Sequence, residues 1–231
     1  MKKAFVALSL GALVAVVGFA EEKSAAEGWQ HWFADGKLDG EIVSGTATYK
    51  VENGVLIGTT TEGSPNTFLV KGPFKDFELQ FEVNVDDELN SGVQVRSKIA
   101  KEGDPAPEGS KNDKPLPAGR VYGPQCEIAI NGTAGNFYDE ARRGTWWSLL
   151  TDTEAVRTDA AKAAFKKGEW NHYRIKVVGD HYQSWVNGVP TADFKQPGDP
   201  EGYIGFQVHG IKKETGPYSV RWRNVKFREI K

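Results

Sequence analysis

Short segments in which apolar and polar residues alternate, separated by turn signals, run through most of this 231-residue chain. In FELQFEVNV, residues 77–85, every second residue is apolar and the residues between them are polar. Such alternation is the pattern of a half-buried β-strand. Asn53-Gly54 and Asn187-Gly188 are typical of hairpin turns, because both turn positions need positive φ. Many such strands joined by tight turns predict an all-β fold, a β-sandwich of two packed antiparallel sheets.

Two segments depart from this pattern. TDAAKAAFKKGEW, residues 158–170, predicts one helix of about two turns, with Thr158 or Asp159 as its N-cap and Gly168 as its stop. Lys101 to Gly119 is rich in proline and glycine and has no apolar period. This second segment is therefore expected to be a long surface loop.

The N-terminus has the pattern of a secretory signal peptide. Lys2 and Lys3 precede an apolar run from Ala4 to Phe19, and small residues stand before Glu21. A membrane anchor is the alternative, but the run is short for a span and no second hydrophobic segment follows it. We expect a signal peptide at 1–20, a flexible leader at 21–28 and a single β-sandwich domain at 29–231, periplasmic or secreted.

Charge and cysteine content exclude several classes of partner. The net charge is −2, with 29 basic and 31 acidic residues interspersed along the chain. This balance favours neither nucleic acid nor, once the signal is cleaved, a membrane surface as a partner. Cys126 is the only cysteine, so no internal disulfide forms. The sequence leaves the oligomeric state open.

Three of the expected strands carry a second, polar face. In SGVQVRSK, PQCEIAI and YIGFQVHG, residues 91–98, 124–130 and 203–210, an amide is followed two residues later by an ionisable group. Because side chains alternate along a strand, one face should be buried between the sheets, with Val93, Val95, Cys126, Ile128, Ile130, Ile204, Phe206 and Val208. The opposite face is either a solvated outer surface or the lining of a ligand groove. Its residues are Gln94, Arg96, Gln125, Glu127, Gln207 and His209.

The segment NGTAGNFYDEARRGTWW, residues 131–147, crowds aromatic side chains with charges of both signs. Such a loop suits hydrogen bonding to hydroxyl groups and stacking on sugar rings. Its candidate substrate-binding residues are Tyr138, Asp139, Glu140, Arg142 and Arg143. Asp139 or Glu140 could equally pair with an arginine and order the loop. Trp185, just before the second Asn-Gly turn, could stack on a ligand or cap the core.

Other catalytic signatures are missing from the sequence. It has no G-x-S-x-G, no P-loop, no H-E-x-x-H and no paired cysteines, and its four histidines lack metal-ligand spacing. The sequence therefore indicates no cofactor with certainty, and the metal ligands are unknown. Whether the protein binds a divalent cation stays open.

Several motifs together resemble a known family. RVYGPQCEIAI, FYDEARRGTWW, KKGEWNHYRIKVVGD, SWVNGVPTADF and GYIGFQVHG stand in an order similar to that of the 3-keto-disaccharide hydrolase domain family, over about Trp29 to Ile230. The resemblance implies a concanavalin A-like, laminin G-like jelly roll and a small-molecule carbohydrate as substrate. It also implies that Arg96, Glu127 and His209 occupy the family's groove positions.

The chemistry that this resemblance implies needs a base and a donor. A ketone at C3 acidifies the C2 proton, so a base can remove that proton and the glycosidic oxygen can leave, with water added afterwards for net hydrolysis. His209 or Glu127 could be the base, and Arg96 could stabilise the enolate charge. An ordinary glycosidase would instead use two carboxylates about 5 to 9.5 Å apart, such as Glu127 with Asp139 or Glu140. The alternative function is a non-catalytic carbohydrate-binding module on the same fold.

Overall fold

The computed structural model of the protein describes residues 28–147 and 158–231. The expected signal peptide, 1–20, and all but Gly28 of the expected leader lie outside the described residues. The elements along the described chain are β1 Gln30–His31, β2 Glu41–Val43, β3 Thr48–Glu52, β4 Val55–Thr59, β5 Thr67–Phe74, β6 Phe77–Val85, β7 Ser91–Ile99, β8 Val121–Ile128, β9 Phe137–Glu140, α2 Asp159–Lys162, β10 Asn171–Val178, β11 His181–Val186, β12 Val189–Lys195, β13 Gly202–Val208 and β14 Ser219–Glu229.

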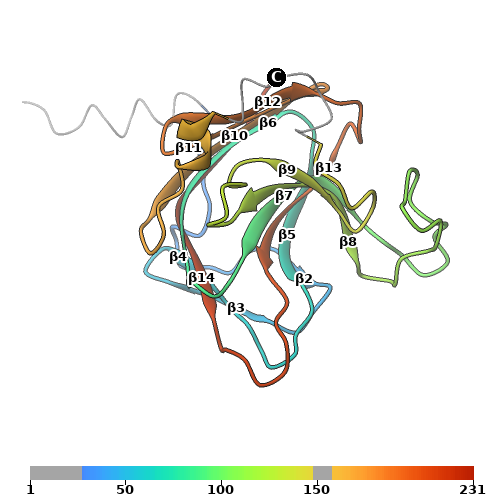
Figure 1. Ribbon diagram of the computed structural model, residues 1–231, viewed down its shortest axis with the longest axis horizontal. Helices are drawn as coiled ribbons and strands as arrows, with labels where there is room; N and C mark the ends of the chain where they lie inside the picture. The colour runs from blue at the N-terminus through green and yellow to red at the C-terminus, as the bar shows by residue number, and fades with distance from the viewer. Residues whose placement is uncertain (1–27, 148–157) are drawn as a thin grey trace, which may run out of the picture.

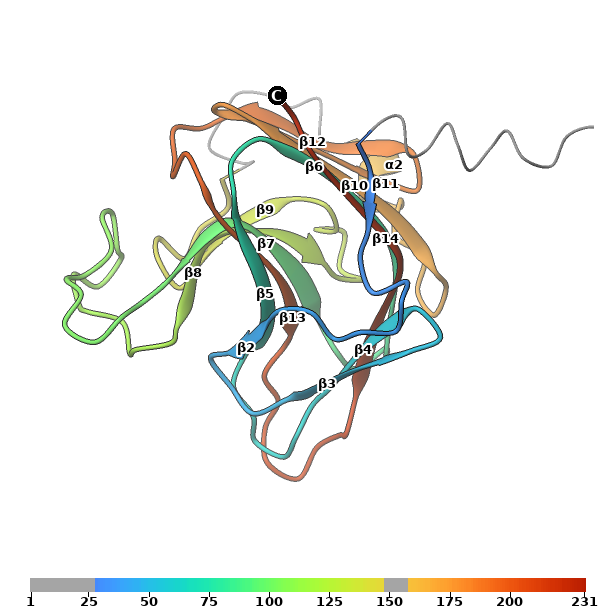
Figure 2. The same ribbon diagram turned by 180° about the vertical axis from the view of Figure 1, so that it is seen from behind.

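Within the described ranges these strands form two antiparallel sheets, one of eight strands and one of six. The eight-stranded sheet has the order β12-β11-β10-β6-β14-β4-β3, with β1 beside β14. The six-stranded sheet has the order β2-β5-β13-β7-β8-β9. Figures 1 and 2 show the two sheets as separate layers, with β7, β8, β9 and β13 on one side and β6, β10 and β14 on the other. The expected all-β sandwich is confirmed.

One hydrophobic core fills the space between the sheets. It contains the inward residues of both layers, such as Val93 and Cys126 from one sheet and Phe81 and Trp222 from the other. Phe206 is fully buried at its centre, where its ring meets the rings of Phe81 and Trp222 edge-on. All of the core residues expected from the three strands are buried except one.

Ile130 is the exception, and its expected burial is wrong. The side chain is 48% exposed. Strand β8 ends at Ile128, and the chain turns at Ile130 rather than continuing the alternation. An Asn-Gly pair follows directly, so the period of two does not extend to the end of the apolar run.

Both Asn-Gly pairs form the expected hairpin turns. Asn53 and Gly54 join β3 to β4 with φ of 51° and 74°, and Asn187 and Gly188 join β11 to β12 with φ of 49° and 80°. Thr158 is the N-cap of α2, accepting a hydrogen bond from the backbone N–H of Ala161 at 3.1 Å. The helix is a single turn that ends at Lys162, well before Gly168, and is therefore shorter than expected.

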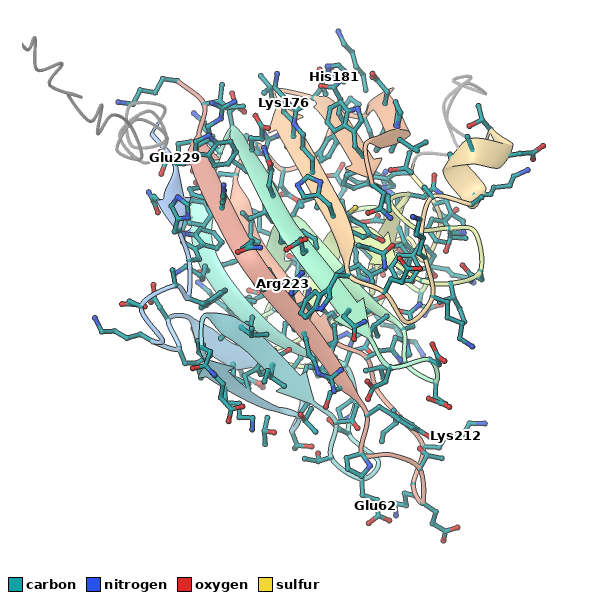
Figure 3. The ribbon with its side chains drawn as sticks, turned by 90° about the vertical axis from the view of Figure 1, so that its left-hand side faces the viewer. Glu62, Lys176, His181, Lys212, Arg223 and Glu229 are labelled. Carbon is teal, nitrogen blue, oxygen red and sulfur yellow. The ribbon has the colours of Figure 1, made fainter. Side chains whose placement is uncertain are left out.

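Residues 101–119 form turns without strands, as expected, and the segment between β7 and β8 projects away from both sheets in the two ribbon views. No helix in the described ranges is both long and apolar enough to cross a membrane. The loops that contain Glu62 and Lys212 extend together from one end of the sandwich (Figure 3), where the backbone N–H of Ile211 donates to Ser64.

Candidate active site

A polar pocket lies on the side of the six-stranded sheet that faces away from the core, and its volume is about 380 Å³. Strands β8, β9 and β13 and the segments beside them supply its walls. The residues that line it are Asn66, Asn90, Gln125, Glu127, Tyr138, Glu140, Trp146, Gln207 and His209. Six of the residues expected at the site are thus brought together: Gln125, Glu127, Tyr138, Glu140, Gln207 and His209.

Glu127 is held on the floor of this pocket with 8% of its surface exposed. Its Oε1 accepts a hydrogen bond of 2.5 Å from Asn90 Nδ2, and its Oε2 accepts one of 3.2 Å from Gln125 Nε2. Burial raises the pKa of Glu127 above its ordinary value, and these hydrogen bonds and the nearby His209 oppose the increase only in part. This carboxyl therefore holds a proton to higher pH than an exposed glutamate does.

A glycine on the neighbouring strand makes room for this arrangement. Gly92 lies opposite Glu127, and a Cβ at Gly92 would come within 2.5 Å of the side-chain carbon of Gln125. The Gln125 amide therefore lies across the space that a larger residue would fill, and from there it reaches Glu127. On the core side, Tyr173 Oη donates to the backbone carbonyl of Glu127 at 3.2 Å and ties it to the other sheet.

His209 follows directly after β13, and one ring nitrogen is already engaged. Its Nδ1 lies 2.7 Å from the carbonyl oxygen of Gly210. A carbonyl only accepts, so Nδ1 carries the hydrogen in this contact, and in the neutral ring Nε2 is then the basic nitrogen. The backbone N–H of Gly210 donates to Asn66 Oδ1 at 2.8 Å, which fixes this segment against the start of β5.

Tyr138 and Trp146 supply the aromatic part of the pocket wall. Their ring centroids are 5.2 Å apart, nearly edge to face. Burial and then the carboxylates of Glu140, Glu127 and Asp139 raise the pKa of Tyr138, so its hydroxyl stays a neutral donor. Glu140 accepts from Arg120 Nη2 at 2.5 Å and from Asn66 Nδ2 at 3.3 Å, so this carboxylate is already paired.

The expected place of Arg96 in this pocket is wrong. Arg96 has a φ of 47°, and one extra residue of β7 is accommodated between Gln94 and Lys98 against β8. This β-bulge shifts the alternation, so Ser97 rather than Arg96 shares the face of Gln94, and Ser97 Oγ forms a hydrogen bond with the Gln94 amide. Arg96 instead reaches the turns of the other sheet.

There, the guanidinium of Arg96 is 2% exposed, and all of its hydrogen bonds go to the protein. It donates to the carbonyls of Lys75 and Gly179 and to Asp76 Oδ1, each at 2.5 Å. It also lies over the ring of Tyr182. This arginine bridges the two sheets and is not available to a ligand in the pocket of Glu127.

Other expected site residues also lie elsewhere. Gln94 is fully buried beneath the pocket, with its amide 3.0 Å from that of Gln125. Asp139 points to the opposite side of β9 from its neighbours, fully buried, and pairs with Arg142 and Arg143. The alternative in which this aspartate orders the loop is the correct one.

Trp185 also lies outside the pocket, in β11 of the eight-stranded sheet. It lies on the outer face of the eight-stranded sheet, the face that Figure 3 views, where the Arg174 guanidinium lies 4.5 Å from its ring centroid. The structure therefore places Trp185 neither at this pocket nor in the core.

Asn66, Asn90 and Trp146 line the pocket but were not expected from the sequence. Trp146 stands at the end of the aromatic and charged segment that did mark this region. Asn66 and Asn90 stand just before β5 and β7, outside the alternating runs, and no pattern in the chain identifies them.

The described residues contain no group of three or more His, Cys, Asp or Glu side chains placed to hold a metal ion. A larger pocket, of about 560 Å³, lies near β2 and β5. Its charged lining residues are Asp39, Glu41 and Lys71, of which Lys71 pairs with Asp39 and also lies over the ring of Trp32. The pocket of Glu127 and His209 is therefore the stronger candidate for chemistry.

Comparison with known proteins gives one family and one fold. The family model of the 3-keto-alpha-glucoside-1,2-lyase-like domain matches residues 19–228. No curated protein sequence matches the chain significantly. A predicted glycosyl hydrolase from Parabacteroides distasonis has a similar structure, with a TM-score of 0.54 and 19% identity over 91% of this chain and 97% of that one.

Two structures from Bacillus subtilis are also similar. Carbohydrate-binding module CBM66 has a TM-score of 0.52 and 13% identity, over 87% of this chain and 96% of that one. A protein of unknown function with a galectin-like fold has a TM-score of 0.50 and 12% identity, over 90% and 91% of the two chains. At these identities the likeness is one of fold, and it confirms the expected lectin-like jelly roll.

Proposed function

The chain belongs to the 3-keto-alpha-glucoside-1,2-lyase-like domain family, and on this premise we propose that it is an enzyme that cleaves 3-keto-glycosides by elimination and hydration. The observation that supports the proposal most is that two suitable groups line the same pocket. One is the buried carboxyl of Glu127, whose pKa is raised, and the other is the imidazole of His209, whose Nε2 is left basic. Elimination needs one acid and one base in such a pocket.

In the first step His209 acts as the base. Its Nε2 takes the proton from C2, the C2–H bond breaks, and the electron pair moves to form a C2–C3 double bond with negative charge on the ketone oxygen. The fixed Nδ1–H contact to Gly210 keeps the ring in the tautomer that can accept this proton. Burial of the site strengthens every hydrogen bond to the developing charge.

In the second step Glu127 acts as the acid. The C3 ketone re-forms, a C1–C2 double bond appears, the bond from C1 to the glycosidic oxygen breaks, and that oxygen takes the proton of Glu127. Water then adds its hydroxyl group to C1 and gives its other proton to the Glu127 carboxylate, while protonated His209 returns a proton to C2. Both residues are restored, and the sum of the steps is hydrolysis. The raised pKa of Glu127 suits this role, because the carboxyl must be protonated before the leaving group departs.

A non-catalytic carbohydrate-binding module is the second candidate. The neighbouring rings of Tyr138 and Trp146 at the pocket favour it, because aromatic rings stack on sugars in binding sites. It requires neither the basic nitrogen of His209 nor the raised pKa of Glu127.

Turnover of p-nitrophenyl 3-keto-α-glucoside, beside the unoxidised p-nitrophenyl α-glucoside, tests the choice. We expect release of nitrophenol only from the keto compound, and a slower rate when C2 carries deuterium because the C2–H bond breaks. His209→Ala should lower the rate by about 10² to 10⁴. Saturable binding of the keto compound without any turnover by the wild-type protein would favour the binding module instead.

Export is part of the proposal and has its own test. The sequence pattern of residues 1–20 supports secretion across the inner membrane of a bacterial cell. The protein recovered from the periplasm or the medium should begin at Glu21 when its N-terminus is sequenced. An intact Met1 on protein recovered from the cytoplasm would contradict this localisation.

A further inference from the structure

Three buried amide atoms in the pocket have no hydrogen-bond partner among the described residues. Two are the Nε2 and Oε1 of Gln207, a residue of β13 that is 0% exposed, and the third is the Oδ1 of Asn90. Both residues line the pocket that contains Glu127 and His209. A buried amide without partners costs free energy, so atoms of this kind mark a place where something else supplies the hydrogen bonds.

The other amides of the pocket are already engaged. Gln125 donates to Glu127 and lies against Gln94, while Asn66 donates to Glu140 and accepts from Gly210. Asn90 also uses its Nδ2 on Glu127. Among the described residues that line the pocket, Gln207 is therefore the one whose side-chain amide nitrogen donates no hydrogen bond.

The proposed elimination needs a hydrogen-bond donor, and this amide could supply it. Negative charge develops on the ketone oxygen, and a hydrogen-bond donor must meet it. The described residues that line the pocket include no lysine or arginine. Arg96 donates its hydrogen bonds elsewhere, to the backbone carbonyls of Lys75 and Gly179 among others. The donor must then be a neutral group.

We propose that Gln207 is a catalytic residue that donates from Nε2 to the ketone oxygen at C3, while its Oε1 and the Oδ1 of Asn90 accept hydrogen bonds from hydroxyl groups of the same sugar. This inference rests on the proposed function. A ketone can only accept, whereas the hydroxyl groups beside it can donate. The side-chain amide of Gln207 has a donor, Nε2, beside an acceptor, Oε1. It can therefore bind the ketone oxygen and an adjacent hydroxyl group of the sugar at the same time.

Replacement of Gln207 by methionine tests this role, because methionine keeps the length of the side chain and removes both hydrogen-bonding atoms. With p-nitrophenyl 3-keto-α-glucoside, we expect kcat to fall by about 10² to 10³, as for the loss of one donor to a developing oxyanion. KM should change much less. The thermal midpoint should be unchanged or higher, since the amide has no protein partner to lose.

Asn171→Leu is the matched control for the stability measurement. Asn171 is also 0% exposed, but its amide bonds to the backbone of Lys166 and Glu169, and it lies in β10, outside the pocket. This variant should lose thermal stability while the folded fraction keeps the wild-type kcat. The comparison separates an amide that holds the fold from one that contacts the substrate.

Each outcome decides a different point. Turnover by Gln207→Met within about threefold of an active wild-type protein overturns the role of Gln207 and leaves the proposed function standing. A fall in its thermal midpoint as large as that of Asn171→Leu also overturns it, since the amide would then have a structural partner. A wild-type protein that never turns over the keto compound overturns the proposed function, and this inference falls with it.

Discussion

Asn90 donates a hydrogen bond of 2.5 Å from Nδ2 to the Oε1 of Glu127, a carboxyl that is 8% exposed. Gln125 donates to the other oxygen. Both donors are neutral amides, so no cation in hydrogen-bond contact offsets the cost of burying a charge on this carboxylate. The pKa of Glu127 is accordingly raised by burial despite both hydrogen bonds.

Glu127→Gln should therefore be more stable than the wild-type protein at neutral and alkaline pH. Below the ordinary pKa of 4.5, the wild-type carboxyl is protonated in both states and the two proteins should differ little. As pH rises above that value, the unfolded wild-type protein loses its proton before the folded one does, so its free energy of unfolding falls relative to that of the variant. The gap should stop growing once pH exceeds the folded pKa.

Urea unfolding of both proteins across this pH range measures that gap. All other titrating groups are the same in the two chains, so the difference in the free energy of unfolding reports mainly the titration of Glu127. A gap that stays constant with pH, or that narrows as pH rises, would mean that the folded protein does not raise the pKa of this carboxyl.

Arg96→Met should destabilise the protein without lowering its catalytic rate. The guanidinium loses its bonds to Lys75, Gly179 and Asp76. Breaking a buried ion pair typically costs about 3 to 5 kcal/mol, and because Asp76 is about one-third exposed, we expect the lower end, about 3 kcal/mol. Urea unfolding measures the loss, and kcat is measured on folded protein. A large fall in kcat at unchanged stability would show that Arg96 takes part in the reaction.

The general layout could be predicted from the sequence because it depends on local signals. The alternation of residues 77–85 and the Asn-Gly pairs at 53 and 187 act within a few residues, and the structure follows them. The shared pocket of Glu127 and Gln207 also follows from alternation on β8 and β13, the two strands that flank β7 in one sheet. Period-two reasoning succeeds wherever the ladder is regular.

The remaining part of the site depends on features that alternation does not encode. Arg96 adopts positive φ, a conformation that few residues other than glycine adopt, so nothing in the sequence marks the bulge that turns it away. Trp185 obeys the alternation of β11, but its strand belongs to the other sheet. Which strand enters which sheet is decided by long-range pairing, and a single sequence does not reveal it.

Phe206→Ala tests the core that supports the pocket. Phe206 is fully buried between the sheets, and its neighbours Gln207 and His209 line the pocket on the other side of the same strand region. Removal of the ring leaves a cavity and should cost about 3 to 5 kcal/mol. Denaturant unfolding measures the loss, and Phe206→Leu should lose clearly less. An unchanged unfolding midpoint for the alanine variant would place this side chain outside the core.

The proposed roles of Glu127 as acid and His209 as base predict different responses of the two variants to the leaving group. Nitrophenolate departs without the help of an acid, whereas the alkoxide of a second sugar needs a proton as its bond to C1 breaks. Glu127→Gln should therefore retain most of its turnover of p-nitrophenyl 3-keto-α-glucoside and lose about 10² or more on a 3-keto-disaccharide. His209→Ala should lose a similar factor on both substrates, because both need the C2 proton removed. Rates for the two variants on the two substrates complete the test. If Glu127→Gln loses equally on both while His209→Ala does not, the carboxyl is the base and the assignment of the two residues must be exchanged.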